Sequence, residues 1–298
     1  MEYRNLSGYL KEKYGARMGK ICIDGGFTCP NRDGRCGHGG CIFCGERGAG
    51  EHINPRESIA EQVRAHLIDA PADGKYIAYF QNFTNTYAPT ETLRERYDAA
   101  LIDERIKVLA IGTRPDCIDV EVAELLAEYK DRLDIWVELG LQTASDEAAE
   151  LMNRGYKTSR FEETVELLSR YGIPVVAHMM LGLPRTVDED AYRTVDLLNR
   201  AGVFGVKIHS VYVMKNTRLA EMHNAGEYTP IGFEDYTRLA AECIARLRPD
   251  IVVHRITGDC PRGLLVAPEW SQDKNRVIAK IREKMSVNRW SQGSLYNA

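Results

Sequence analysis

Three common sequence features are missing from this chain of 298 residues. No apolar run approaches the roughly 20 residues of a membrane-spanning helix, and residues 1–20 lack the apolar segment of a signal peptide. A Gly-rich phosphate loop of the GxxxxGK or GxGxxG type is also absent, which disfavours a nucleotide-binding doubly wound fold. We therefore expect a soluble, cytoplasmic protein without a membrane partner.

The composition marks no boundary between two large domains. The sequence has no low-complexity segment and no long linker, and its hydrophobic content of 44% allows a sizeable core. We expect one catalytic domain over residues 1–260, with a basic C-terminal extension over residues 261–298 packed on it.

Charge is low overall but unevenly distributed. The formal net charge is −4, which argues against a general nucleic-acid binder. Residues 1–20 carry a balance of +3 and residues 261–298 a balance of +4, so the body of the chain carries −11. Basic ends on an acidic body are able to form one polyanion-binding face. The alternative is that they are solvated helix surfaces.

Apolar runs of strand length alternate with stretches of helical periodicity along the chain. The predicted strands are apolar on both faces, as in a parallel sheet covered by helices, so a doubly wound sheet and a (β/α) barrel both fit. The strands are expected at 20–24, 76–80, 107–112, 134–142, 173–180, 204–213 and 251–256. The first helix opens at Pro55 and Ser58 and runs to about Ala70. Further helices are expected at 91–103, 119–130, 145–153, 159–171, 187–201, 217–225, 232–247 and 269–285.

Polar side chains gather where the predicted strands end. In a (β/α) barrel such a ring lies on the face that carries the active site, which favours the barrel over the doubly wound sheet. The ring consists of Gln81 to Thr86, Thr113 to Pro115, Glu138 with Gln142, His178, Lys207 with His209, and His254 with Arg255.

A loop over residues 25–44 holds four of the eight cysteines. Cys41 and Cys44 form a CxxC pair, and Cys29 and Cys36 lie upstream of it. Three thiolates on a cubane iron–sulfur cluster would leave one iron open, whereas four would close the site. A zinc site using His38 is the alternative, and the spacing favours iron–sulfur over zinc.

The loop, GGFTCPNRDG…GGCIFC, resembles that of the radical SAM superfamily, in particular the YhcC/YtqA type. The middle of the chain also resembles the radical SAM domain of the elongator catalytic subunit, which acts on tRNA wobble uridines and carries a further acetyltransferase domain. The resemblance to the YhcC/YtqA type covers nearly the whole chain. Its further motifs are GTRPDC at 112–117, VELGLQTA at 137–144, NRG at 153–155, VVAHMMLGLPRT at 175–186, VKIHSVYVMKNTRLA at 206–220 and HRITGDCPR at 254–262.

This resemblance implies a partial (β/α)6 barrel with a C-terminal helical arm. It also implies a [4Fe–4S] cluster on Cys29, Cys41 and Cys44, with Cys22 and Cys36 outside the ligand set. S-adenosylmethionine (SAM) would bind the open iron. An electron from a reductant such as flavodoxin or ferredoxin would cleave it to methionine and a 5′-deoxyadenosyl radical, which abstracts hydrogen from the substrate.

SAM-binding residues are expected among the strand-end groups. Glu138, inside the apolar run WVELGLQ, is costly to bury without a partner, so it is functional or ion-paired. Arg154 in NRG resembles the arginine that pairs the SAM carboxylate, the alternative being a surface arginine at a helix end. The predicted SAM-binding set is Gln81, Thr84, Asn85, Thr113, Glu138, Gln142, Arg154 and His178.

Substrate contacts are expected on the later strands. Lys207 and His209 have the same parity and so share one face of their strand, with Tyr212 beyond them. These three are the predicted catalytic residues. Lys215, Arg255 and Asp259 are weaker candidates.

The family resemblance and the basic termini together suggest a tRNA substrate. We expect the conversion of 5-carboxymethylaminomethyl-uridine at the wobble position to 5-aminomethyl-uridine. Arg and Lys side chains between 262 and 289 would contact phosphates, with the base splayed into the barrel mouth. A radical SAM enzyme acting on a metabolite or a protein, and a non-catalytic iron–sulfur sensor or electron carrier, are the alternatives.

Overall fold

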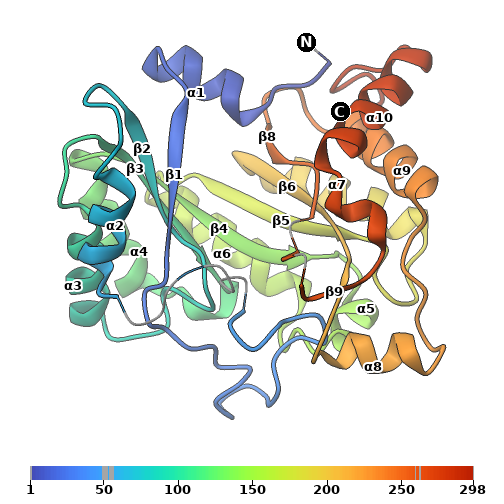
Figure 1. The fold of residues 1–298 in the computed structure, drawn as a ribbon, viewed down its shortest axis with the longest axis horizontal. Coiled ribbons are helices and arrows are strands. Elements are labelled where there is room, and N and C mark those ends of the chain that lie inside the picture. The colour runs from blue at the N-terminus through green and yellow to red at the C-terminus, as the bar shows by residue number, and fades with distance from the viewer. Residues whose placement is uncertain (1, 49–52, 54–56, 259, 262, 298) are drawn as a thin grey trace.

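The computed structural model (Figure 1) describes residues 2–48, 53, 57–258, 260–261 and 263–297. Seven parallel strands form one curved sheet in the order β1-β2-β3-β4-β5-β6-β8, which confirms the expected partial barrel with one strand more than the six implied. The additional strand is β8, which lies within the range predicted at 251–256. The strands are β1 (Met18–Ile23), β2 (Lys75–Phe80), β3 (Ile106–Thr113), β4 (Asp134–Gln142), β5 (Val175–Leu181), β6 (Gly205–Ser210) and β8 (Val252–Arg255).

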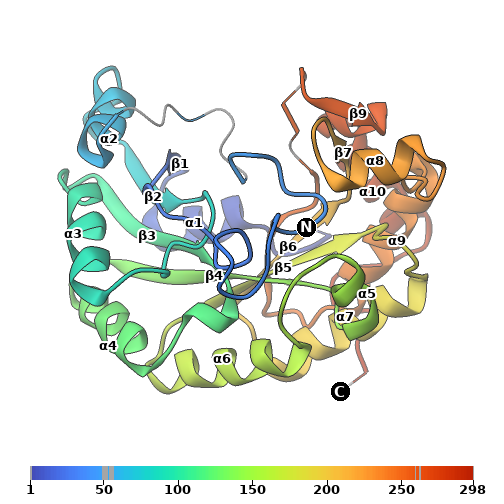
Figure 2. The same ribbon diagram turned by 90° about the horizontal axis from the view of Figure 1, so that it is seen from below.

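Helices cover the convex outer face of this sheet, as Figure 2 shows. The first begins at Ser58, whose side chain and Glu61 form a reciprocal capping box, while Pro55 lies outside the described residues. The helices are α2 (Ile59–Leu67), α3 (Thr90–Ala100), α4 (Val120–Glu128), α5 (Asp146–Leu151), α6 (Thr158–Arg170), α7 (Asp188–Ala201), α8 (Arg218–Asn224), α9 (Phe233–Arg246) and α10 (Lys274–Val287). Three short 3-10 turns lie at Pro115–Cys117, Tyr129–Asp131 and Glu269–Gln272.

The strand predicted at 204–213 is too long. It ends at Ser210, and Val213–Met214 forms a separate strand, β7. This strand pairs antiparallel with β9 (Leu265–Ala267) in a small second sheet. Tyr212 therefore lies in the connection between the two sheets and not on β6.

A helix that the sequence analysis missed, α1 (Leu6–Tyr14), closes the amino end of the half-barrel. Asn5 caps its start, with Oδ1 accepting from the Gly8 N–H at 2.9 Å, and Gly15 ends it in the left-handed conformation. Its buried Leu10 packs against the interior side chains of β2, β3 and β4, among them Tyr79 and Trp136. This apolar plug forms the floor beneath the charged residues described below.

The two faces of the sheet differ in chemistry because side chains alternate along each strand. Outward-facing residues such as Val137 and Leu139 join the large core formed with the helices. Inward-facing residues are apolar near α1 and charged farther up, where Glu138 and Lys207 lie. The prediction of strands apolar on both faces therefore holds only for the lower part of the interior.

The cysteine loop follows β1 and lies across the carboxyl ends of the strands, inside the curve of the sheet (Figure 2). The first and last described segments of the chain are in contact, because the Arg4 N–H donates to Gln292 Oε1 and the Gln292 N–H donates to the Glu2 carbonyl, both at 2.8 Å. Within the part of the chain that is described, no helix is both long and apolar enough to cross a membrane.

Candidate functional site

Tight turns shape the cysteine loop. The N–H groups of Arg32 and Asp33 both donate to the carbonyl of Cys29, at 2.8 and 3.2 Å. The N–H of Cys44 donates to the carbonyl of Cys41 at 3.0 Å, closing the CxxC turn. These turns give the loop its own backbone hydrogen bonds, so it is ordered without helix or strand.

Two asparagines and one arginine attach the loop to the barrel. Asn153, from the NRG motif, donates through Nδ2 to the carbonyls of Gly40 at 2.8 Å and His38 at 3.2 Å. The buried Asn31 donates in return to the Asn153 carbonyl. Arg32 donates to the carbonyls of Cys44 and Gly45 and lies over the Phe83 ring. One function of the NRG motif is therefore to hold the loop.

We expect Asn153→Gly to make the cluster labile. Asn153 has a φ of 56°, so glycine keeps the backbone conformation and removes only the two side-chain hydrogen bonds. Losing two such bonds should accelerate iron release to a chelator by about tenfold. Asn216→Gly is the matched control, because Asn216 is exposed and has a φ of 60°. Equal iron release from the two variants would contradict this role.

Of the three thiols predicted to bind the cluster, Cys41 and Cys44 lie beside each other, and Cys29 interacts electrostatically with Cys41. Cys44 hydrogen-bonds to Cys41, which lowers the pKa of Cys41 and, together with burial, raises that of Cys44. Arg114 lowers the pKa of Cys41 further, whereas the like charge of Cys29 acts to raise it. Among the described residues, no three His, Cys, Asp or Glu side chains converge closely enough for a single metal ion. Adjacent thiols beside a guanidinium suit a multinuclear anionic cluster.

Cys36 contacts Asp116, which follows β3. The side chain of Cys36 is exposed, and its Sγ is 3.9 Å from Asp116 Oδ2. Cys117 Sγ approaches the other oxygen of the same carboxylate, also at 3.9 Å. Cys36 therefore faces Asp116, while Cys41 and Cys44 face each other.

The segment after β2 lies directly against the cysteine loop, because the Thr84 N–H donates to the Thr28 carbonyl at 3.2 Å. Within the described part of the chain, the buried Thr84 Oγ1 and Asn85 Oδ1 have no hydrogen-bond partner. Buried acceptors of this kind require a donor. The ammonium group of SAM is such a donor, so these residues fit the predicted cofactor. Thr113 instead shares a hydrogen bond with Thr86 at 2.7 Å, and Gln81 is half-buried.

Gln142 ends β4 with a φ of 67°, after a register shift that begins at Gly140. Its Nε2 lies 3.0 Å from the place where a Cβ on Gly140 would sit. The Gln142 amide therefore folds back over Gly140, where a side chain at position 140 would crowd it.

Arg154 is fully buried, so it is not the surface arginine of the alternative interpretation. Its five N–H donors reach protein acceptors on Leu141, Thr143, Asp146, Tyr156 and Thr158. No donor is left for a SAM carboxylate, so these contacts give Arg154 a bracing role. Arg114 similarly forms a two-point pair with Asp116, at 2.9 and 2.7 Å, and donates to the Arg154 carbonyl.

A buried charge cluster lies inside the half-barrel. The Glu138 carboxylate is ion-paired with Lys207 and accepts from His178 Nε2 at 2.9 Å and Trp136 Nε1 at 3.3 Å. Lys207 also donates to the Tyr79 hydroxyl at 3.2 Å. The expectation that Glu138 needs a partner is confirmed. Its position is different from the one expected, since Glu138 and Lys207 lie in mid-strand and not on the rim.

The two partners of this ion pair respond to burial in opposite senses. Burial acts to raise the pKa of Glu138, but Lys207 and His178 outweigh it and hold that pKa well below its ordinary value. Burial lowers the pKa of Lys207 to about 7, although Glu138 opposes the shift. Glu138 therefore keeps its charge more firmly than Lys207 does, because three donors surround the carboxylate.

The remaining predicted residues divide between the cluster and its surroundings. The His209 ring lies 5.4 Å from that of His178, and burial lowers the pKa of His209 well below its usual value. Tyr212 is half-buried beyond β6, beside Gly258. Lys215 donates to the Gly263 carbonyl at 3.0 Å, Arg255 ends β8, and Asp259 lies outside the described residues.

Tyr79 was missed from the sequence, and His254, which was expected in the ring at the strand ends, lies in the interior. Tyr79 lies under two ammonium groups, with Lys207 Nζ 4.4 Å and Lys20 Nζ 4.8 Å from its ring centroid. His254 lies edge-on to Trp136 and Phe204, and burial lowers its pKa to about 3. Parity along YIAYF was the available signal for Tyr79, because it shares a face with the interior Ile77.

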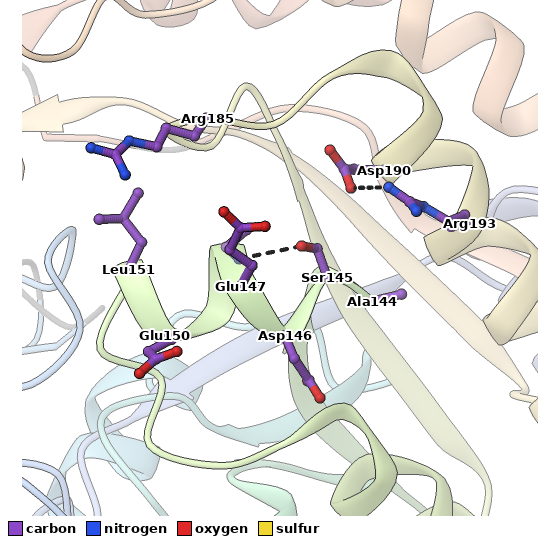
Figure 3. A pocket seen from close by; sticks show the side chains of 10 residues that line it. Ala144, Ser145, Asp146, Glu147, Glu150, Leu151, Arg185, Asp190 and Arg193 are labelled. Atoms are coloured by element: carbon purple, nitrogen blue, oxygen red, sulfur yellow. Dashed lines mark hydrogen bonds and ion pairs between the residues drawn. The ribbon is translucent and has the colours of Figure 1, made fainter.

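A pocket of about 630 Å³ lies on the rim outside the strand ends, between α5 and the start of α7. Figure 3 shows Arg185 above Leu151, with Glu147 facing the same space and Asp190 paired to Arg193. The pocket contains neither the cluster cysteines nor the interior charged residues, so it is separate from the site described here.

This chain belongs to the radical SAM superfamily. The superfamily pattern matches residues 33–198, and that of the Radical_SAM C-terminal domain matches residues 203–286. A [4Fe–4S] cluster and SAM are therefore its cofactors. The match begins after Cys29 and includes Cys36, Cys41 and Cys44.

Among its relatives, YtqA of Bacillus subtilis is 37% identical over 298 residues, which span 99% of this chain and 92% of YtqA. The tRNA uridine(34) acetyltransferase of Dehalococcoides mccartyi is 31% identical over 157 residues, 51% of this chain and 33% of that protein. The solved structure of Elp3 from the archaeon Methanocaldococcus infernus, lacking its N-terminal residues 1–46, shares the fold, with a TM-score of 0.70 and 19% identity over 92% of this chain and 64% of that chain.

Proposed function

We propose that this radical SAM enzyme acts on a modified wobble uridine of tRNA, converting 5-carboxymethylaminomethyl-uridine to 5-aminomethyl-uridine. The observation that carries the proposal is the similarity to a tRNA uridine(34)-modifying relative, together with the shared half-barrel of Elp3. The similarity to that relative covers half of this chain, so it supports the tRNA substrate more than the chemistry. Acetyl transfer is not carried over.

In this proposal Cys29, Cys41 and Cys44 hold the [4Fe–4S] cluster. Bound SAM would then supply a 5′-deoxyadenosyl radical for hydrogen abstraction. Thr84 and Asn85 would accept from the SAM ammonium through their unpartnered oxygens, with Gln81, Thr113 and Gln142 nearby. Glu138, Lys207 and His178 would form the polar floor beneath the substrate, and His209 and Tyr212 would contact it from β6 and the segment after it.

The tRNA must approach the carboxyl-end face, where the cysteine loop lies. Helix α10 is poorly suited to bind phosphates there, because Lys284 pairs with Glu234 at 2.7 Å and Lys280 with Glu283 at 2.8 Å. Arg262 lies outside the described residues. Arg35, exposed on the cysteine loop with its guanidinium 5.5 Å from the Tyr87 ring centroid, is a better candidate. An arginine over an aromatic ring is able to stack on a splayed base and pair with a phosphate.

Arg35→Gln should weaken tRNA binding by about tenfold, because one charge-assisted phosphate contact is lost. Reductive SAM cleavage without tRNA should be unchanged, since Arg35 is not placed among the cofactor ligands. Filter binding to tRNA and the yield of 5′-deoxyadenosine are the two measurements. Lys280→Gln is the control, because its charge already has a partner. Equal affinities of the two variants would remove Arg35 from the interface.

Nucleoside analysis of a gene-deletion strain tests the proposed function in the cell. Mass spectrometry of digested bulk tRNA should show 5-carboxymethylaminomethyl-uridine accumulating at the expense of 5-aminomethyl-uridine. A plasmid copy carrying Cys41→Ala should not restore the profile, whereas the wild-type copy should. An unchanged nucleoside profile in the deletion strain would remove the tRNA proposal and leave only the superfamily assignment.

A further inference from the structure

Lys20 on β1 points into the half-barrel. Its neighbours of the same parity, Met18 and Cys22, pack in the interior cluster, and Lys20 Nζ lies 4.8 Å from the Tyr79 ring centroid. Within the described part of the chain, Lys20 has no carboxylate within ion-pair distance. It therefore brings a positive charge into the interior without a direct counter-ion there.

Among the described residues, the interior carboxylate near Lys20 is that of Glu138, and both of its oxygens already accept hydrogen bonds. Glu138 Oε2 accepts from Lys207 and from His178 at 2.9 Å, and Oε1 accepts from Trp136 at 3.3 Å. Two ammonium groups thus lie over the Tyr79 ring against one carboxylate. Like charge from Lys20 contributes to the lowered pKa of Lys207, and an anion between them would relieve this repulsion.

A third group completes the arrangement from β6. The buried Nε2 atom of His209 has no hydrogen-bond partner within the described part of the chain. Lys20, His178 and His209 are all partly exposed, so a ligand is able to reach these side chains, although the His209 Nε2 atom itself is covered. The ammonium groups of Lys20 and Lys207 and the unpartnered ring nitrogen of His209 are groups that recognise a carboxylate in proteins.

We propose that Lys20, together with Lys207 and His209, binds the carboxylate of the substrate. This subsite rests on the proposed function, in which the base carries a CH2–NH–CH2–COO⁻ group. The carbon next to the carboxylate carries the hydrogens nearest to it, so holding the carboxylate fixes those C–H bonds in place. Lys20 thereby distinguishes the substrate from the product, 5-aminomethyl-uridine, which has lost the carboxylate.

N-benzylglycine tests the subsite directly, because it presents an aromatic ring followed by CH2–NH–CH2–COO⁻. Its binding to the anaerobic holoenzyme is measured by ligand-observed NMR, with benzylamine as the probe lacking the carboxylate. Wild type should prefer N-benzylglycine, and Lys20→Met should weaken its binding by about tenfold or more, the effect of one charged hydrogen bond. Lys20→Arg should retain binding. Lys107→Met is the matched control, since Lys107 on β3 shares the parity of the outward-facing Leu109.

Three results would overturn the proposal: N-benzylglycine binding no better than benzylamine, equal binding to wild type and Lys20→Met, or displacement of N-benzylglycine by methionine. The last would assign the cations to the carboxylate of SAM. Turnover of modified tRNA is measured in parallel. Absent turnover with Lys20-dependent N-benzylglycine binding would remove the proposed function and keep the subsite, and the reverse pattern would remove the subsite alone.

Discussion

Replacing Cys29 with alanine is expected to abolish the iron–sulfur cluster, whereas Cys36→Ala leaves it intact. Cys29 acts to raise the pKa of Cys41 through the charge of its thiolate, and its carbonyl accepts the hydrogen bonds of the turn that begins the loop. Cys36 has an exposed side chain that faces Asp116. A cluster with one open iron needs three thiolates, so losing one of them removes the site. Iron and sulfide content after anaerobic reconstitution, with the visible absorption of the cluster, measures the outcome.

The control for misfolding is the far-ultraviolet circular dichroism of both variants, which should match wild type because the loop contains no helix or strand. Cys117→Ala provides a second control, since Cys117 also faces Asp116. A full cluster in Cys29→Ala together with a lost cluster in Cys36→Ala would show that Cys36 is the third ligand.

Glu138→Gln is expected to lower the free energy of unfolding by about 3 to 5 kcal/mol, because it leaves the buried Lys207 ammonium without its counter-charge. In the variant the pKa of Lys207 falls further below its unfolded value. At a pH between the folded and the unfolded pKa of Lys207, folding releases a proton from this side chain. The free energy of unfolding therefore rises with pH across that interval. Because the pKa of Lys207 in wild type is about 7, wild type gains stability above that pH in the same way, so the deficit should be smallest above about pH 7 and grow as the pH falls below it. Urea unfolding of the anaerobic holoprotein at several pH values measures it.

The double variant Glu138→Gln, Lys207→Met isolates the ion pair. Removing both charges eliminates the unpaired ammonium, so most of the lost stability should return. Because the lysine is gone, the rise of stability with pH should disappear as well. A double variant less stable than Glu138→Gln alone, or a single variant within about 1 kcal/mol of wild type, would show that the pair does not matter for folding.

Sequence patterns predicted the barrel well because each of the seven strands has an apolar outward face and an ordinary length. The end of β6 was misplaced because Val211 and Val213 continue the β-branched run after Ser210. Nothing local shows that the chain leaves the sheet there to pair with β9. Helix α1 was missed because its apolar residues are sparse, although Asn5 and Gly15 provided both cap signals.

The sequence identified several residues of the site, but it did not show which of them contact one another. Spacing and resemblance identified the cysteine loop, and the cost of burial showed that Glu138 needs a partner. The partner, Lys207, is separated from it by 69 residues and reaches it only through the register of β4, β5 and β6. Arg154 shows the opposite limit, because no sequence pattern reveals that all five of its donors are used within the protein.

One measurement tests the central claim most directly. The reconstituted enzyme is incubated anaerobically with dithionite, SAM and tRNA containing 5-carboxymethylaminomethyl-uridine, and both products are quantified by mass spectrometry. We predict that 5′-deoxyadenosine and 5-aminomethyl-uridine form together, and that neither forms with Cys41→Ala. Formation of 5′-deoxyadenosine with the nucleoside unchanged would contradict the claim that this tRNA is the substrate.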